Sequence, residues 1–262
     1  MKKIKKYLKI WWIMSRNSFL GALNHRIGAI SFVVGKVVRF AFFFLFLVSL
    51  MAGSKMLSGY NQNQVLFFYL TFNLIDIISQ FLFREVYRFR PLIITGNFDL
   101  ILVKPVSALF RSLLGGADVL DLITIPPLLI AVIVIGANFN PGIVEILLFI
   151  LLLVNGLLIA TAFHIFALSM AIISTEIDHS IMIYREITSL GRFPIDIFKE
   201  PLKGVITYII PVGIMFTFPA RALMGIVSVS GVIISLFIGF VLIILAITVW
   251  NKVLTRYSSA SS

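Results

Sequence analysis

The chain has no cysteine among its 262 residues, and only 13% of its residues are charged. The first absence excludes a disulfide framework and a metal site built from thiolates. The low share of charges argues against a soluble domain, in which about a quarter of the residues are charged. The phosphate-binding loop G-x-x-x-x-G-K-[ST] is also absent, because the glycines at 115 and 116 are followed by no lysine. We therefore expect neither a bound nucleotide nor an enzyme active site.

Apolar residues make up 60% of the sequence, and the mean hydropathy is +1.07. They form runs near or above about 18 residues, the length that crosses roughly 30 Å of hydrocarbon. These runs predict an all-α polytopic membrane protein, with residues 1–262 forming a single transmembrane domain. The six expected spans are 31–52, 64–83, 118–136, 143–173, 204–218 and 227–250.

The net charge of +11 would suggest nucleic acid as a partner of a soluble protein. In a membrane protein, Lys and Arg instead mark the cytoplasmic side. Of the 22 Lys and Arg residues, 18 fall before the first span, in segments 84–111 and 175–203, or in the C-terminal tail. Only two fall in the alternate loops. This asymmetry predicts cytoplasmic termini and two cytoplasmic segments, 84–111 and 175–203.

Residues 1–27 have the composition of a helix that lies in the membrane interface. Five lysines up to Lys9 can meet anionic head groups, and Trp11 and Trp12 suit the headgroup level. A basic tail that leads directly into the first span is the alternative. In either case membrane lipid is an expected partner.

Segment 84–111 contains a short helix signal at 98–104. Gly96 can turn the chain, Asn97 is a good N-cap, and Asp99 suits the positive end of a helix. Pro105 disfavours helix at the residue before it, which leaves about seven residues, roughly 10 Å of helix. Such a helix is not stable alone in water, so it must lie against lipid, against the spans or against a partner protein. The apolar residues that we expect it to expose are Phe98, Leu100, Ile101, Leu102 and Val103.

Three charged residues lie within the first two spans, where charge is costly. Lys36 and Arg39 share one face of the first span, and Asp76 lies at a similar depth in the second. We expect an ion pair between Arg39 and Asp76, either structural or able to bind a cationic substrate. Asp118 and Asp121 open the third span, where they are expected to cap the helix.

Three features together carry a resemblance to a known family. The first is the basic N-terminal segment before the first span. The second is GNFDLILVKPVSALF between the second and third spans, and the third is GRFPIDIFKEPLKGVITYIIPVGIMFTFPARALMG. With these features the chain resembles the membrane subunits of ABC type-2 exporters, in a bacterial branch whose permease and ATPase are separate subunits.

The resemblance implies a transport subunit in the bacterial cytoplasmic (inner) membrane, and no nucleic-acid partner. Two permease subunits, identical or different, would pair above a cytoplasmic ABC ATPase dimer. The ATPase would hold ATP and Mg, and this chain would bind no cofactor or metal. A coupling helix would dock on the ATPase, with a second contact in segment 175–203. The coupling residues would be Phe98, Asp99, Leu100, Ile101, Leu102, Val103, Lys104, Arg185 and Glu186.

For such an exporter, Phe68, Phe72, Asn73 and Asp76 are the expected lining of the substrate pathway. Lipids, hydrophobic drugs, peptides and lipid-linked glycans would all suit an aromatic cavity. Pro211 and Pro219 interrupt the fifth span, so this stretch can dip back into the membrane. Phe216, Phe218 and Pro219 are then the expected outer gate, and packing without a gate is the alternative.

Other functions remain open at this point. A secondary transporter or channel would work without an ATPase and would show inverted repeats, which the sequence does not show clearly. An intramembrane enzyme would need converging acids or a nucleophile beside a base. A purely structural membrane subunit would be separated from the exporter by a transport assay.

Overall fold

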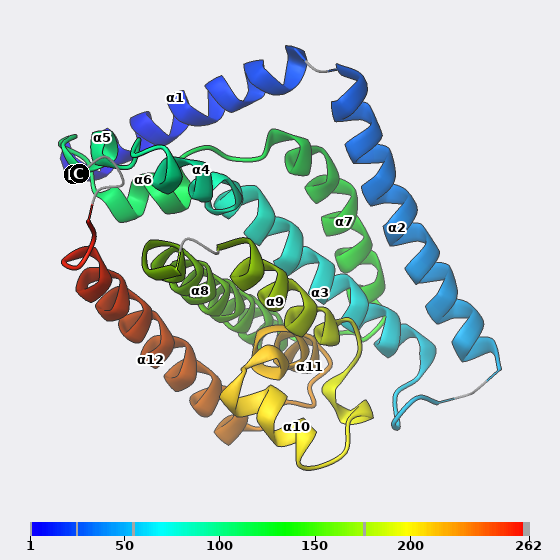
Figure 1. Ribbon diagram of the computed structural model, residues 1–262. Helices are drawn as coiled ribbons and strands as arrows, with labels where there is room; N and C mark the ends of the chain where they lie inside the picture. The colour runs from blue at the N-terminus through cyan, green and yellow to red at the C-terminus, as the bar shows by residue number, and fades with distance from the viewer. Residues whose placement is uncertain (1, 25, 54–55, 175–176, 259–262) are drawn as a thin grey trace.

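The computed structural model of the protein describes residues 2–24, 26–53, 56–174 and 177–258, and the regular elements in these ranges are helical (Figure 1). The predicted all-α class is therefore confirmed. The long helices are α1 (Lys2–Asn24), α2 (Arg26–Ala52), α3 (Gln62–Phe83), α7 (Val119–Ala137), α8 (Ile143–Ser174), α9 (Ile177–Ser189) and α12 (Val229–Leu254). The short helices of the first half are η1 (Arg84–Arg88), α4 (Phe89–Ile94), α5 (Asp99–Leu102) and α6 (Ala108–Leu114). Those of the second half are η2 (Leu190–Arg192), η3 (Ile195–Ile197), α10 (Leu202–Gly204), η4 (Val205–Ile209), η5 (Gly213–Thr217) and α11 (Phe218–Leu223).

Five helical stretches are long and apolar enough to cross a membrane, namely α2, α3 with its continuation to Ile94, α7, α8 and α12. They coincide with five of the six predicted spans. A sixth candidate is a pair of shorter segments, Leu202–Ile209 and Gly213–Leu223, that meet at a bend of 74°. The polytopic architecture is thus as predicted, and the sixth crossing is where sequence and structure differ.

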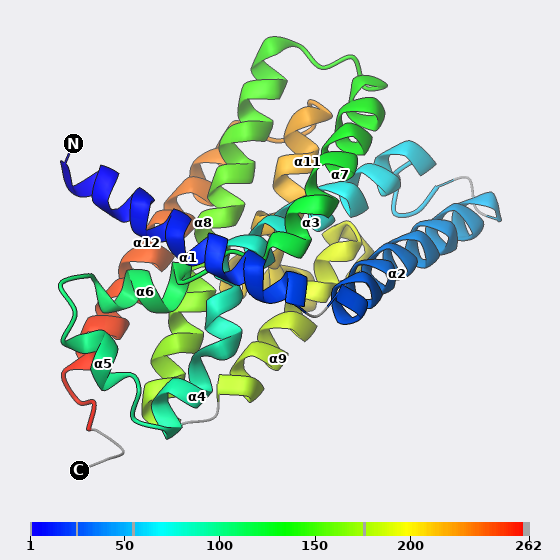
Figure 2. The same ribbon diagram turned by 90° about the horizontal axis from the view of Figure 1, so that it is seen from above.

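The helix bundle has two ends. The terminal end carries α1, α4, α5, α6 and the C-terminal turn of α12 (Figures 1 and 2). The far end carries the loops that join α2 to α3, α7 to α8 and α11 to α12. The segments that were expected to be cytoplasmic near the N-terminus, 1–27 and 84–111, lie together at the terminal end.

The bent pair is tied to one residue, Asp196, near both of its ends. Lys203 near its beginning and Arg221 near its end both form ion pairs with Asp196. Asp196 also accepts a hydrogen bond of 2.8 Å from the hydroxyl of Tyr60, which lies in the loop between α2 and α3. Both limbs of the bent pair are therefore tied to the far end, and we describe it as a re-entrant hairpin; by length and composition alone it also passes as the span predicted at 204–218.

Helix α9 runs from the terminal end toward the far end. At its start, Asp178 accepts a hydrogen bond of 2.8 Å from Arg90 at the terminal end. Beyond its end, the ring of Phe193 lies 5.6 Å from that of Phe43 in α2, and Asp196 follows at the far end. Among the described residues, the segment 175–203 that was expected to be cytoplasmic therefore reaches from the terminal end to the far end. Its residues 175 and 176 lie outside the described part of the chain.

Close packing of α8 on α12 forms the centre of the second half of the bundle. The side-chain amide of Asn155 donates to the backbone oxygen of Ser235 over 2.9 Å. A Cβ at Gly239 would lie only 2.0 Å from the Asn155 Oδ1 atom, so a larger residue does not fit there. An amide hydrogen bond and a small residue thus hold these two helices at short range.

Helix α1 lies across the terminal end and is fastened to the segment that follows α5. The backbone NH of Ser107 donates to the Tyr7 hydroxyl at 3.1 Å, and that of Ala117 donates to Ser15 Oγ at 3.2 Å. Gly116 makes room for this contact, because a Cβ there would lie 2.5 Å from Ser18 Oγ. The predicted N-terminal helix is confirmed, and its position in a membrane interface stays a prediction.

Candidate functional site

A groove runs between α2, α3 and α9 and consists of two adjoining pockets that share Arg39 and Arg192. The deeper pocket has a volume of about 310 Å³ and the one nearer the terminal end about 520 Å³. We call their union the α2–α9 groove. Aromatic rings form much of the deeper wall, contributed by Phe42, Phe43, Phe46, Tyr69 and Phe72.

Two arginines and one aspartate face the deeper part of this groove. The guanidinium of Arg192 lies 5.4 Å from the ring centroid of Phe43 and 5.8 Å from that of Phe72. Such cation–π contacts hold a charge over a ring while its N–H groups remain able to bind an anion. Asp76 accepts a hydrogen bond of 2.7 Å from Gln80 Nε2. With Arg39, the local formal charge is +1.

The predicted ion pair between Arg39 and Asp76 is not formed, although both residues line the groove. Lys36 takes the structural role instead. Its ammonium pairs with the buried carboxylate of Asp121 in α7 and donates to Gln80 Oε1 at 3.1 Å. The physical reason is position around the helix axis: residues 36 and 39 share a broad face, but α7 packs only against the side that bears Lys36.

Of the residues expected to line a substrate pathway, three line the groove: Phe72, Asn73 and Asp76. Phe68 does not, because it is 1% exposed and its ring packs 4.9 Å from that of Tyr60. Phe68 therefore does not line this groove, and its ring belongs to the core beside the loop between α2 and α3.

The expected cap of α7 is half confirmed. Asp118 is its N-cap, and its carboxylate accepts from the Leu120 NH at 3.1 Å. Asp121 lies in the first turn but serves the ion pair with Lys36. His164 in α8 is 2% exposed, and its Nδ1 atom lies 2.7 Å from the Ala160 carbonyl oxygen.

The short helix expected at 98–104 is found as α5, with only four residues, Asp99–Leu102. Gly96 makes the turn with φ +70° as expected. Asn97 is not the N-cap, since Phe98 holds that position and the Asn97 amide donates to Thr95 Oγ1 at 2.8 Å. No side-chain cap holds the start of α5, and two buried side chains anchor this short helix instead.

These anchors are Phe98 and Ile101, which were expected to be exposed. Phe98 is 0% exposed, and its ring centroid lies 6.5 Å from that of Trp250 in α12. The apolar surface that remains exposed consists of Leu100, Leu102 and Val103. Residues 98 and 101 are three apart and therefore share one face of the helix, and this spacing is the sequence signal that separates the buried from the exposed residues.

Arg185 and Glu186, expected to form a second contact with the ATPase, lie away from α5. Both are exposed on α9 and line the α2–α9 groove together with Arg39. Helices α5 and α9 are well separated in both views (Figures 1 and 2). The structure thus brings Arg185 and Glu186 to the groove and does not bring them to α5.

The expected gate residues belong to the re-entrant hairpin and are buried. The ring of Phe216 lies 4.8 Å from that of Phe72, so the hairpin tip forms one wall behind the groove lining. Gly191 allows this approach, because a Cβ there would lie 2.3 Å from the Phe216 ring. Phe218 and Pro219 follow on the outgoing limb, in α11.

A charged cluster at the far end was not predicted from the sequence. Asp196 binds Lys203, Arg221 and Tyr60, and the Arg221 Nε donates to the Tyr60 hydroxyl at 3.2 Å. Burial by itself raises the pKa of the Asp196 carboxyl. The hydrogen bonds from its three partners outweigh burial and bring this pKa down to about 2. The cluster closes the hairpin onto the loop between α2 and α3.

The sequence profile of the ABC-2 family transporter proteins matches residues 37–261, which is nearly the whole chain. Comparison with curated proteins and with solved structures finds no match.

Proposed function

Because the chain belongs to the ABC-2 family of transporter proteins, we propose that it is the permease subunit of an ATP-driven exporter. The observation that carries this proposal is the deeper pocket of the α2–α9 groove, in which aromatic rings and one excess positive charge lie side by side. In the proposed assembly a second permease subunit covers the groove and an ABC ATPase dimer binds at the terminal end. ATP and Mg belong to that ATPase, and the present chain contributes no catalysis.

The exposed face of α2 supports the proposed pairing of two permease subunits. Only 6% of its most apolar stretch is buried within the chain. Phe42 and Phe46, which line the groove, are 71% and 49% exposed. A second subunit, identical or related, would bury these rings and turn an open groove into an enclosed pathway.

The charges of the deeper pocket of this groove favour an amphipathic cargo with a negatively charged group. Arg39 and Arg192 outnumber Asp76, whose carboxylate is already engaged by Gln80. The rings beside them suit an apolar body. This reverses the choice of a cationic substrate that Asp76 alone would favour, and Arg185 and Glu186 act in this groove in our proposal and not at the ATPase.

Helix α5 is the proposed coupling element. Leu100, Leu102, Val103 and Lys104 form its exposed surface, while Phe98 is fixed against Trp250 of α12. Burial, and after it the nearby carboxylate of Asp99, raises the pKa of the Tyr257 phenol in the C-terminal tail. A push on α5 would thus reach α12, whose other side packs on α8. The terminal end would face the cytoplasm and the hairpin would act as the outer gate in a bacterial inner membrane.

Co-purification with a co-expressed ABC ATPase tests the coupling proposal. Leu100→Glu and Val103→Glu should each release the ATPase, because they place a charge in an apolar contact. Ile94→Glu is the matched control, since Ile94 is 54% exposed on the neighbouring α4 and lies outside the proposed contact. Loss of ATPase with all three variants, or with none, would contradict a docking role for α5.

Reconstitution of the complex in liposomes tests the pathway. ATPase activity should rise with amphipathic anions, and Arg39→Gln or Arg192→Gln should lower this stimulation by roughly tenfold. Arg16→Gln, which removes an exposed charge from α1, should leave it unchanged. Transport that proceeds equally well without ATP would instead favour a secondary transporter or channel.

A further inference from the structure

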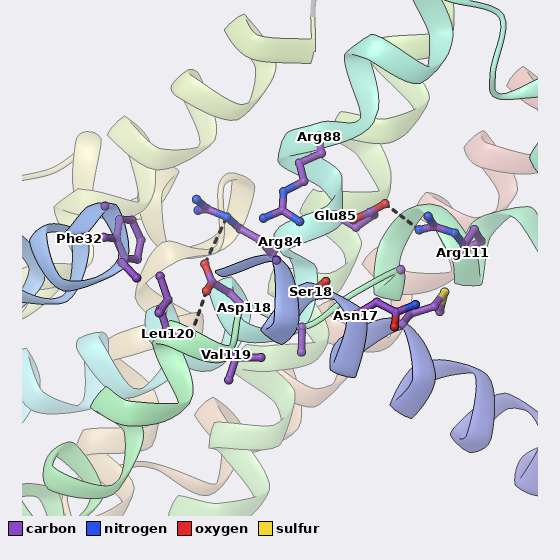
Figure 3. A pocket seen from close by; sticks show the side chains of 16 residues that line it. Asn17, Ser18, Phe32, Arg84, Glu85, Arg88, Arg111, Asp118, Val119 and Leu120 are labelled. Carbon is purple, nitrogen blue, oxygen red and sulfur yellow. Dashed lines mark hydrogen bonds and ion pairs between the residues drawn. The ribbon is translucent and has the colours of Figure 1, made fainter. Parts of the chain in front are cut away.

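The seam between α2 and α7 contains two pockets that follow one another along the same pair of helices. At the terminal end lies a polar pocket of about 710 Å³, roofed by α1 (Figure 3). One to two helical turns deeper lies an apolar pocket of about 380 Å³. Ala29 and Phe32 line the first, and Val33, Val37 and Phe40 line the second. We call the two together the α2–α7 seam; it is separate from the α2–α9 groove.

Three arginines line the polar pocket. Arg84 Nε lies 3.3 Å from Asp118 Oδ2, and Arg111 Nη1 lies 2.7 Å from Glu85 Oε1. Among the described residues, Arg88 has no ion pair and no side-chain hydrogen bond, and its guanidinium points toward Arg84 (Figure 3). The pocket therefore holds one positive charge in excess, with unused N–H donors on all three arginines.

The apolar pocket of the α2–α7 seam carries no such excess of positive charge. Lys36 reaches it, but its charge is matched by the buried carboxylate of Asp121. Most of the remaining wall is apolar, with Ile123, Pro127 and Ala131 contributed by α7. The ring of Phe32 marks the boundary, 5.5 Å from the Arg84 guanidinium and 4.8 Å from the Lys36 ammonium.

We propose that the α2–α7 seam binds one anionic phospholipid. Its phosphate lies among Arg84, Arg88 and Arg111, and one acyl chain follows the apolar pocket between α2 and α7. Arginine suits this ligand because its planar N–H groups bind phosphate oxygens in pairs. Basic pockets between membrane helices at the cytoplasmic side are known to receive such head groups. The apolar continuation distinguishes a lipid from free phosphate, which would use only the upper pocket.

Helix α1 has a defined part in this site. Asn17 and Ser18 close the pocket from above, and they are held there because Gly116 lets Ser18 approach the chain closely. A bound lipid would therefore contact α1, α2 and α7 together.

Native mass spectrometry of the purified full-length chain tests the proposal, with added phosphatidylglycerol, phosphatidylcholine or inorganic phosphate. We expect one retained phosphatidylglycerol and weaker retention of phosphatidylcholine. Arg88→Gln should weaken phosphatidylglycerol binding by about tenfold, the loss expected for one charge-assisted hydrogen bond. Arg16→Gln removes the same charge from the outside of α1 and should change nothing.

A second pair of variants tests the acyl-chain position. Val37→Trp fills the apolar pocket and should displace the lipid, whereas Val34→Trp should not, because Val34 lies outside it. The two valines are 54% and 53% exposed, so neither change disturbs a packed core. Equal lipid binding by wild type and Arg88→Gln would overturn the proposal. So would inorganic phosphate that binds as tightly as the lipid, or equal effects of the two tryptophans.

Discussion

Helices α2 and α3 are consecutive spans of similar composition, yet they meet opposite surroundings. In the most apolar stretch of α3, 67% of the residues are buried within the chain, against 6% in α2. The less buried helix is the more apolar of the two. Hydropathy therefore predicts that a segment crosses a membrane but not whether it contacts protein or lipid, because both environments accept the same side chains.

The two helices are also held in different ways. Apolar packing surrounds α3 on several sides, with Phe67, Leu70 and Ile75 at 0% exposure. Helix α2 relies on fewer contacts, several of them polar. Besides the ion pair of Lys36, the Tyr69 hydroxyl donates to the Phe40 carbonyl oxygen at 3.2 Å. We therefore expect core truncation to harm α3 and charge removal to harm the attachment of α2.

The largest effect is expected for Phe67→Ala. The ring of Phe67 lies 5.3 Å from that of Phe139 and 5.9 Å from that of Phe149, so its removal leaves a cavity. The free energy of unfolding should fall by about 3–5 kcal/mol. Phe42→Ala in α2 is the matched control, and at 71% exposure it should cost less than about 0.5 kcal/mol. Unfolding in mixed micelles measures the free energy for both variants. Equal losses would contradict the difference in burial between α3 and α2.

An effect of about 3 kcal/mol is expected for Asp121→Ala, because it leaves the Lys36 ammonium without its partner between α2 and α7. The double variant Lys36→Met with Asp121→Leu should recover most of the loss, since no charge then remains buried. Hydrogen exchange of α2 amides provides a second readout and should rise in the single variant alone. A double variant as unstable as the single one would show that the pair itself, and not its desolvation, holds α2.

The sequence predicted the features that depend on single segments. Five spans, the N-terminal helix, the turn at Gly96 and the cap at Asp118 follow from local composition and local geometry. The same reasoning did not place α9 between the two ends of the bundle, because its polar residues Asp178, Arg185 and Glu186 lower its hydropathy. Those residues are tolerated because they line the groove and do not face lipid.

The sequence alone could not predict which residues of different segments pair with one another. Lys36 and Arg39 lie on one face of α2, so their spacing does not show which of them would pair with Asp76. Only the position of α7 makes Asp121 the partner of Lys36. The re-entrant hairpin was indicated by Pro211 and Pro219, but its closure needed Asp196. That residue lies 25 positions from Arg221 and 136 from Tyr60, so no local pattern links them.

The smallest effect is expected at the far end, where Asp196 joins the loop between α2 and α3 to the hairpin. The folded-state pKa of Asp196 is about 2, below the ordinary value of 3.8. Its ion pairs therefore stabilise the fold fully above about pH 4, and this contribution is lost as the pH falls toward 2. The difference in pKa corresponds to about 2 kcal/mol. Asp196→Asn should cost that amount at pH 7, and the gap between wild type and variant should close at pH 2.

This pH dependence also separates the two ways of holding the helices. Below pH 3 the loop next to α2 should exchange amide hydrogens faster, while the amides of α3 near Ile75 stay protected by apolar packing. A uniform rise in exchange over both helices would mean that they unfold as one unit. In that case the contrast in burial between α2 and α3 would have no counterpart in local stability.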